Sequence, residues 1–368
     1  MKNLEHIKVI ISGGGTGGHI YPAIAIANEI TFRYPKAEIL FVGALGRMEM
    51  EKVPKAGYKI VGLPIAGIQR NLSFKNLLLP FKLIKSLLMA RKIIKDFKAD
   101  AAIGVGGYAS GPLLWMANSL KVPTLIQEQN SFAGITNKIL AKKVTSICVA
   151  YEGMENYFPN SKIVLTGNPV RQDILNLSNK KEHAASVFGL DLNKKTILVI
   201  GGSLGARTIN ESILEGITSI DLDKYNLLWQ TGKWFFEQAK SKTKGTKNVF
   251  VSDFIYQMDL VYAIADVVIS RAGALSVSEL ALAAKPTIFV PSPNVSEDHQ
   301  TKNAMALVEE NAAMIVKDIE AKDKLVLSLN SLLANEDLQK QLVTNIHKFA
   351  KPNASQEIVD QVEKLFEI

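Results

Sequence analysis

The chain has 368 residues, of which 47% are hydrophobic and 21% are charged, so a disordered chain is excluded and two domains of ordinary size fit the length. Its single cysteine, Cys148, excludes an intrachain disulfide and is typical of a reducing compartment. The excess of 43 Lys and Arg over 35 Asp and Glu gives a net charge of +8, which favours an anionic partner. No basic stripe with interleaved aromatic residues is present, so nucleic acid is the least favoured of these partners.

Strand-like apolar runs alternate with helical stretches along the whole chain. The first half predicts strands at 7–11, 38–42, 101–105, 124–127, 146–149 and 163–165, and the second half predicts them at 197–200, 227–230, 248–251, 267–270, 287–290 and 313–316. Such alternation is typical of parallel sheets covered by helices. The expected fold class is therefore α/β, with two Rossmann-like, doubly wound domains that face each other across a cleft.

A glycine-rich turn follows the first predicted strand. Residues 13–19 read Gly-Gly-Gly-Thr-Gly-Gly-His, and such a turn at a helix N-terminus presents backbone N–H groups to an anion. The turn differs from the nicotinamide fingerprint, because His19 occupies the first helical turn and Pro22 follows it. A single glycine turn is a weak signal, since it can also close a strand tightly with no ligand.

The stretch 73–98 has two apolar stripes at helical spacing. One of them predicts a face in the core and consists of Leu83, Leu87, Ala90, Ile94 and Phe97. The other lies among basic residues and favours a membrane interface with anionic headgroups, and this set comprises Leu77, Phe81, Ile84 and Leu88 with Lys82, Lys85 and Lys92. Burial of the second stripe against a loop or a partner subunit explains the pattern equally well.

Two polar segments follow later strands of the first half. Residues 104–112 contain Gly106, Gly107 and Tyr108 and predict a second anion site in the same domain. Residues 127–130 read Gln-Glu-Gln-Asn, which are side chains suited to binding sugar hydroxyls. Turn residues at 167–171 then mark a seam, which gives an N-terminal domain at 1–167 and a C-terminal domain at 168–349, with a helix at about 350–368 expected to pack back on the first domain.

The second half repeats the glycine pattern twice. Residues 201–207 and 270–279 each follow a predicted strand and lead into a helix, so both favour binding of a diphosphate. Glu279 could accept hydrogen bonds from a ribose diol, although a Glu early in a helix is also a routine cap. The polar loop at 297–304 follows the predicted strand at 287–290. It is expected at the carboxyl ends of the parallel strands, where ligands of α/β proteins bind.

Six of these motifs together resemble the MurG family within glycosyltransferase family 28. They are residues 14–19, 106–112, 128–130, 167–171, 201–207 and 271–279, in order and over nearly the whole chain. The resemblance implies a GT-B fold and an inverting transfer of GlcNAc from UDP-GlcNAc to the MurNAc 4-hydroxyl of lipid I, forming lipid II. It also implies no cofactor, no bound catalytic metal, and a place on the cytoplasmic face of the inner membrane. The associated partners are anionic lipids and other proteins of cell-wall synthesis, in the context of cell shape and division.

The resemblance also carries over site residues. Those implied to bind the donor are Thr16, Gly17, Gly18, Asn130, Arg171, Ser203, Ile255, Ala274, Leu275, Ser276, Val277, Ser278, Glu279 and Gln300, with Glu279 on the ribose hydroxyls. Those implied to face the lipid diphosphate are Gly14, Gly15, Gly106, Gly107 and Tyr108. Two positions depart from the family pattern: Leu204 stands where many members have Gln, and His299 stands where a Gln often precedes Gln300.

His19 is the candidate general base, because an imidazole titrates near neutral pH and lies at the mouth of the first glycine turn. A purely structural hydrogen bond from His19 is the alternative. Three other functions fit the same motifs: another GT-B glycolipid glycosyltransferase, a UDP-GlcNAc 2-epimerase, and a UDP-sugar-binding subunit without activity.

Overall fold

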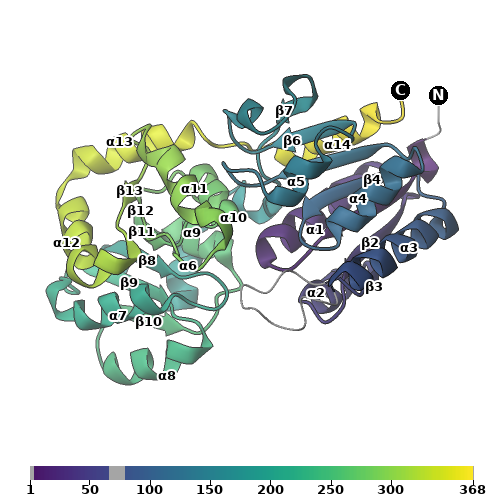
Figure 1. Cartoon of the computed structure of the whole chain (residues 1–368). Helices are drawn as coiled ribbons and strands as arrows, with labels where there is room; N and C mark the ends of the chain where they lie inside the picture. Colours follow the sequence, from purple (N-terminus) through teal and green to yellow (C-terminus); the bar gives the residue numbers. More distant parts are fainter. Residues whose placement is uncertain (1–3, 66–78, 368) are drawn as a thin grey trace. The chain divides into compact units, whose positions relative to one another are not determined.

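The computed structural model describes residues 4–65 and 79–367 and divides into two compact units (Figure 1). Unit 1 comprises described residues within Met1–Val170 and Asn353–Ile368, and unit 2 comprises Arg171–Pro352. Each unit holds one parallel sheet covered by helices. The predicted pair of doubly wound α/β domains is therefore confirmed.

The described part of unit 1 contains a seven-stranded sheet with the order β3-β2-β1-β4-β5-β6-β7, in which all pairs are parallel. Its strands are β1 (Lys8–Gly13), β2 (Glu38–Ala44), β3 (Lys59–Leu63), β4 (Ala101–Gly106), β5 (Thr124–Glu128), β6 (Ser146–Val149) and β7 (Ile163–Leu165). The sequence patterns missed β3, because this edge strand has only five residues and Gly62 interrupts its short apolar run.

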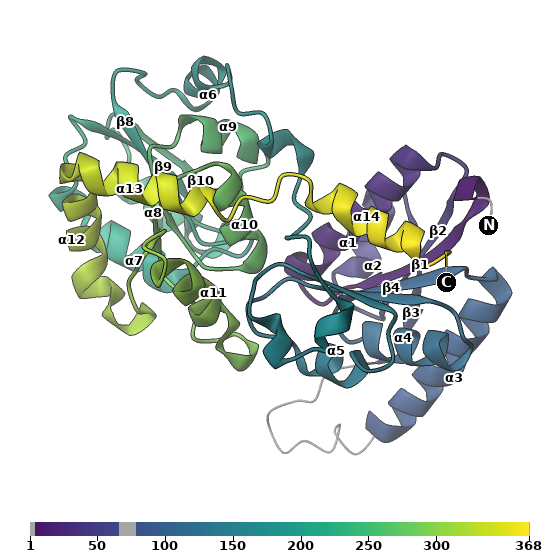
Figure 2. The same ribbon diagram turned by 90° about the horizontal axis from the view of Figure 1, so that it is seen from above.

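Alternate residues of β1 face opposite sides of this sheet. Val9 and Ile11 pack with α1 and α14, whereas Ile10 packs in the core beneath α3, α4 and α5. The helices are α1 (Gly17–Arg33), α2 (Glu49–Lys55), α3 (Leu79–Phe97), α4 (Ser110–Ser119), α5 (Ile135–Leu140) and α14 (Ala354–Lys364). The last helix lies beside α1 (Figure 2), where Arg33 pairs with Asp360 at 2.6 Å and with Glu363 at 2.9 Å.

The exposed residues of α3 correct one expectation. Ala90 and Ile94 are buried as predicted, but Leu83 is 43% exposed and does not belong to the core. Phe81 (72% exposed), Ile84 (56%) and Leu88 (63%) lie on the surface. The first half of α3 therefore exposes apolar side chains from both predicted stripes. Leu77 lies outside the described residues.

Unit 2 contains a six-stranded sheet with the order β10-β9-β8-β11-β12-β13, again with all pairs parallel. Its strands are β8 (Lys195–Ile200), β9 (Tyr225–Gln230), β10 (Val249–Ser252), β11 (Val267–Ser270), β12 (Thr287–Phe289) and β13 (Met314–Ile315). Its helices are α6 (Lys181–Phe188), α7 (Arg207–Glu215), α8 (Lys233–Lys242), α9 (Met258–Ile264), α10 (Ala274–Leu282), α11 (His299–Val308), α12 (Ala321–Ala334) and α13 (Glu336–His347).

The strand orders determine where a ligand would bind in each unit. The winding reverses between β1 and β4 in unit 1 and between β8 and β11 in unit 2. In doubly wound sheets, ligands bind at this switch point, outside the carboxyl ends of the strands. All four of these strands end in a predicted glycine turn, so the turns lie at the two switch points.

Candidate active site

The two glycine turns of unit 1 lie side by side, because β1 and β4 are neighbouring parallel strands. The Gly14 N–H donates to the Gly106 carbonyl at 3.3 Å. Helix α1 begins at Gly17, after Thr16 in an extended conformation. The N–H groups of Gly17 and Gly18 lie in the first helical turn, where a helix has no internal acceptors for them, so they are suited to binding an anion.

The His19 ring lies between these two turns. Its Nδ1 is 3.0 Å from the Gly14 carbonyl oxygen and 3.4 Å from Oγ1 of Thr16. A carbonyl only accepts, so Nδ1 carries the hydrogen in the shorter contact, and the neutral ring has its lone pair on Nε2. A Cβ on Gly106 would overlap the imidazole, so a glycine is needed there. This tautomer is the one that a general base acting through Nε2 requires.

Two of the N–H groups expected to face a lipid diphosphate, those of Gly14 and Gly15, are already hydrogen-bonded within unit 1. Gly14 donates to Gly106, and Gly15 donates to Oε2 of Glu49 at 2.8 Å. Tyr108 is different, since its ring is 47% exposed and the Arg47 guanidinium lies 5.8 Å from the ring centroid. Sequence reasoning missed Arg47, in the turn after β2, and Glu49, the first residue of α2, because neither belongs to a recognisable motif.

The segment 127–130 differs from its expected role. Gln127, Glu128 and Gln129 are almost fully buried, and their side chains hold neighbouring loops instead of facing a sugar. Glu128 accepts hydrogen bonds from the N–H of Gly134 at 3.0 Å and from the Asn137 amide at 2.8 Å. The Asn130 amide donates to the same carboxylate at 3.2 Å. Only Asn130, half-buried at the end of the run, keeps its candidate role.

Two helices of unit 2 begin at the switch point of its sheet. Helix α7 follows the turn that contains Ser203 and Leu204, both of which are exposed. Helix α10 begins at Ala274 directly after Gly273, and its first turn includes Leu275 and Ser276. These helix N-termini can stabilise a diphosphate. Val277 has its side chain in the core, and the Ser278 hydroxyl donates to the Ala274 carbonyl at 3.1 Å.

Glu279 lies one turn inside α10 and is 8% exposed. Its Oε2 accepts a hydrogen bond from the Tyr262 hydroxyl at 3.0 Å, and its Oε1 lies 3.3 Å from Nε of Arg171. Burial raises the pKa of Glu279, while the Arg171 charge and the Tyr262 hydrogen bond act in the opposite direction. Burial also raises the pKa of Tyr262, so this residue stays a neutral donor. The Glu279 carboxylate is thus fixed in place by Tyr262 and Arg171, so its role extends beyond capping the N-terminus of α10.

Gln230, at the end of β9, joins two predicted donor segments. Its Oε1 accepts the Ile255 N–H at 3.0 Å, and its Nε2 donates to the Gly202 carbonyl at 3.0 Å. Ile255 is buried, while the neighbouring rings of Phe254 and Tyr256 pack edge to face. Sequence reasoning missed Gln230 because a polar residue ending a strand carries no distinctive signal.

The first turn of α11 holds two further candidates, His299 and Gln300. Oε1 of Gln300 accepts the Ser292 N–H at 2.8 Å, so this side chain also braces the loop between β12 and α11. His299 Nε2 lies 3.2 Å from Oε2 of Glu297. Leu204, the other departure from the family pattern, is 74% exposed.

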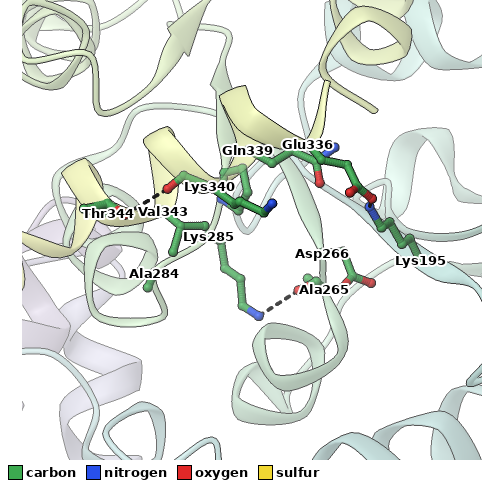
Figure 3. A pocket seen from close by; sticks show the side chains of 11 residues that line it. Lys195, Ala265, Asp266, Ala284, Lys285, Glu336, Gln339, Lys340, Val343 and Thr344 are labelled. Carbon is green, nitrogen blue, oxygen red and sulfur yellow. Dashed lines mark hydrogen bonds and ion pairs between the residues drawn. The ribbon is translucent and has the colours of Figure 1, made fainter. Parts of the chain in front are cut away.

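A cavity of about 440 Å³ lies at the opposite, amino-terminal edge of the unit 2 sheet (Figure 3). Its wall includes Lys195, Asp266, Lys285, Glu336 and Lys340. Lys285 donates to the Ala265 carbonyl at 2.7 Å. The predicted site residues lie elsewhere, so this cavity takes no part in the site described above.

The comparisons with known proteins agree with this geometry. The N-terminal domain model of glycosyltransferase family 28 matches residues 9–149, and the C-terminal domain model matches residues 196–360. The chain belongs to glycosyltransferase family 28. The predicted family and its enzyme class, a glycosyltransferase, are therefore confirmed.

Individual proteins similar to this chain cover nearly its whole length. A relative from Cytophaga hutchinsonii, named UDP-N-acetylglucosamine--N-acetylmuramyl-(pentapeptide) pyrophosphoryl-undecaprenol N-acetylglucosamine transferase, is 57% identical over 100% of this chain and 98% of its own length. The crystal structure of Acinetobacter baumannii MurG is 31% identical, with a TM-score of 0.78 over 97% of this chain and 99% of that one. A UDP-GlcNAc 2-epimerase from Neisseria meningitidis shares the fold at 16% identity, with a TM-score of 0.68 over 97% and 100% of the two chains.

The described residues of this family 28 chain show neither a metal-binding cluster nor a membrane-spanning helix. Within 4–65 and 79–367, no group of three or more His, Cys, Asp or Glu side chains could hold a metal ion. None of the helices in the same ranges is both long and apolar enough to cross a membrane.

Proposed function

We propose that this chain transfers GlcNAc from UDP-GlcNAc to the MurNAc 4-hydroxyl of lipid I and so forms lipid II. The observation that carries the proposal is the 57% identity, over the whole chain, to a relative named for this transfer. The geometry supports it, since each unit presents glycine turns and helix N-termini at the switch point of its sheet.

His19 is proposed as the general base. Its Nδ1–H is held by the Gly14 carbonyl, so Nε2 takes the proton of the acceptor hydroxyl as that oxygen attacks C1 of GlcNAc. The bond from C1 to the UDP oxygen breaks with inversion, and UDP leaves with the electron pair. A base of this kind contributes roughly 10²- to 10⁴-fold to the rate.

The donor is proposed to bind in unit 2. The first turn of α10 and the turn at Ser203 meet the diphosphate, where their N–H groups stabilise the leaving charge without a catalytic metal. Glu279 accepts the ribose hydroxyls, and the backbone of Ile255 meets the uracil edge. Because the Ile255 N–H is bonded to Gln230, the Ile255 carbonyl meets the base directly, or the uracil displaces the Gln230 amide.

Unit 1 is proposed to bind the cytoplasmic face of the inner membrane through α3 and its neighbours. Phe81, Ile84 and Leu88 are exposed, with Lys85 and Lys92 beside them. Helix α4 packs against both α3 and α5, and exposed apolar residues occur on α5 too, namely Ile135 and Ile139. Apolar side chains among cations suit a bilayer with anionic headgroups. Lipid II made there supplies cell-wall synthesis, and with it cell shape and division.

Transfer of labelled GlcNAc from UDP-GlcNAc to a lipid I analogue, with and without EDTA, tests the proposal. The wild type is expected to form the lipid II analogue in both conditions, and His19→Ala and Glu279→Ala are each expected to lose about 100-fold or more in kcat/KM. His183→Ala, an exposed histidine on α6, is the matched control. Conversion of UDP-GlcNAc to UDP-ManNAc without any lipid transfer would instead identify an epimerase and overturn the proposal.

A further inference from the structure

Glu49 is a buried carboxylate beneath the first glycine turn. It is 1% exposed and begins α2, more than thirty residues after the turn in the sequence. Its Oε2 accepts the Gly15 N–H at 2.8 Å, and its Oε1 accepts the Ala44 N–H at 3.0 Å. A Cβ on Gly14 would overlap Oε1 of Glu49, so the glycine allows the carboxylate to approach the backbone.

The contact between Glu49 and Gly15 changes the role expected of the first glycine turn. A glycine turn before a helix normally offers its N–H groups to a bound anion. Here the Gly15 N–H is bonded to the protein's own carboxylate, and the Gly14 N–H is bonded to Gly106. The Gly14 and Gly15 N–H groups therefore bind acceptors within the protein, one of them the Glu49 carboxylate, and are not available to a phosphate.

The turn held by Glu49 in turn holds His19. The Gly14 carbonyl, one residue before the N–H that Glu49 accepts, takes the Nδ1–H of His19 at 3.0 Å. Fixing the Gly14–Gly15 backbone therefore fixes both the orientation of the imidazole and its tautomer.

We propose that Glu49 is a positioning residue for His19, and that the first glycine turn serves to orient the base while the diphosphate binds beyond Gly15. The inference rests on the proposed function for its kinetic consequences. Its structural consequence, the Nδ1–H tautomer of His19, does not depend on any activity. The carboxylate is the suitable group because two N–H donors from separate segments need two acceptor oxygens, and glutamine offers only one.

The test compares Glu49→Gln with Glu51→Gln, a change on the same helix at an exposed residue that pairs with Lys55. Glu49→Gln is expected to lower kcat on the order of 10- to 100-fold, because a small displacement of a catalytic group is costly, with a change in the KM for UDP-GlcNAc below about two-fold. Glu51→Gln is expected to match the wild type. In a His19→Ala background, Glu49→Gln is expected to change kcat by less than about two-fold, because the residue it positions is gone.

A measurement without substrate separates this inference from the proposed reaction. In ¹⁵N-histidine-labelled protein, with the His19 signals assigned from His19→Ala, the wild type is expected to show the Nδ1–H tautomer, and Glu49→Gln is expected to show a mixture of tautomers. An unchanged tautomer, or a loss of kcat that is as large without His19 as with it, would overturn the inference. If Glu49→Gln does not fold, Glu49→Asp is examined by both measurements, with the same outcomes decisive. An inactive wild type with the expected tautomer change would count against the proposed reaction alone.

Discussion

Arg171 and Glu279 form an ion pair in unit 2, with Nε of the guanidinium 3.3 Å from Oε1 of the carboxylate. Burial raises the pKa of Glu279, and Arg171 opposes that rise. If ionised Glu279 accepts the ribose hydroxyls, donor binding releases protons from the fraction of Glu279 that is protonated. The affinity should then weaken as the pH falls through the raised pKa.

Replacing Arg171 with Met should move that weakening to higher pH, because the charge that holds the pKa of Glu279 down is lost. The dissociation constant of UDP-GlcNAc, measured by calorimetry at a low and a high pH, should increase more at the low pH, because burial raises the pKa of Glu279 above its ordinary value of 4.5. Arg171→Lys keeps the charge and is the control. A loss of affinity that is equal at both pH values would show that Glu279 does not titrate in this way.

Gln230 should support donor binding by joining the turn at Gly202 to the segment at Ile255. Gln230→Leu removes both hydrogen bonds at similar volume, and we expect the KM for UDP-GlcNAc to rise about ten-fold, since losing a hydrogen bond to a buried group costs roughly 1–3 kcal/mol. Steady-state kinetics measure this, with Gln238→Leu at an exposed position of α8 as the control. An unchanged KM would remove Gln230 from the donor site.

Arg47 should bind the lipid diphosphate, because its guanidinium is exposed beside Tyr108 and the N–H groups of Gly14 and Gly15 are bonded internally. Arg47→Ala should raise the KM for the lipid I analogue about ten-fold or more, as expected for a charge-assisted hydrogen bond of roughly 1.5–3 kcal/mol. The KM for UDP-GlcNAc should stay the same. Lys36→Ala, an equal change of charge elsewhere on unit 1, should affect neither constant. A rise in both KM values would point to a general disturbance of unit 1.

Lys285 should make the stability of unit 2 depend on pH. Burial lowers its pKa in the folded state, with Asp266 opposing, so the unfolded chain binds the proton more tightly than the folded one. The buried charged amine destabilises the folded state at neutral pH. The free energy of unfolding should therefore rise as the pH increases from the folded-state pKa of Lys285 to its ordinary value of 10.5. The free energy of unfolding of the wild type, relative to Lys285→Met, should therefore increase between about pH 7 and about pH 10. For each decrease of one in the folded-state pKa of Lys285 below its ordinary value, the free energy of unfolding should increase by roughly 1.4 kcal/mol.

Urea unfolding at the two pH values measures this difference. Lys340→Met, on the rim of the same cavity with a side chain 76% exposed, is the control and should show no such increase. A difference between wild type and Lys285→Met that is constant with pH would contradict the prediction.

Helix α3 should carry the binding to anionic membranes. Reversing the charge at Lys82, Lys85 and Lys92 should weaken sedimentation with anionic vesicles on the order of ten-fold or more, since each cation near such a surface contributes about 1 kcal/mol. Turnover of a short-chain acceptor in solution should be unchanged. Reversal of three exposed lysines on unit 2, at 240, 242 and 244, is the control for net charge. Unchanged vesicle binding by the α3 variant would exclude this helix as the membrane surface.

The amino-acid sequence by itself determined the fold class and every strand of the two sheets except β3. Apolar β-branched runs such as 197–200, each ending in glycines, predicted strands, parallel sheets and the glycine turns that the structure places at the switch points. These features depend on hydrophobic patterns among residues that are close in sequence. They also depend on the rules for connecting strands and helices in doubly wound sheets. The family followed from six such motifs in order.

Only the tertiary structure decided which side chains those turns contact. Glu49 reaches Gly15 across 34 positions of the sequence, and Gln230 reaches Ile255 across 25. The polar run at Gln127 to Gln129 predicted a sugar site, but its side chains are buried. They form hydrogen bonds with backbone groups such as the Val105 carbonyl and the Gly134 N–H, which would otherwise lack a partner. Leu83 matched a core stripe, but the core ends before the first turns of α3. Partner choice and burial arise from packing between distant segments, and a periodic pattern along one segment does not contain that information.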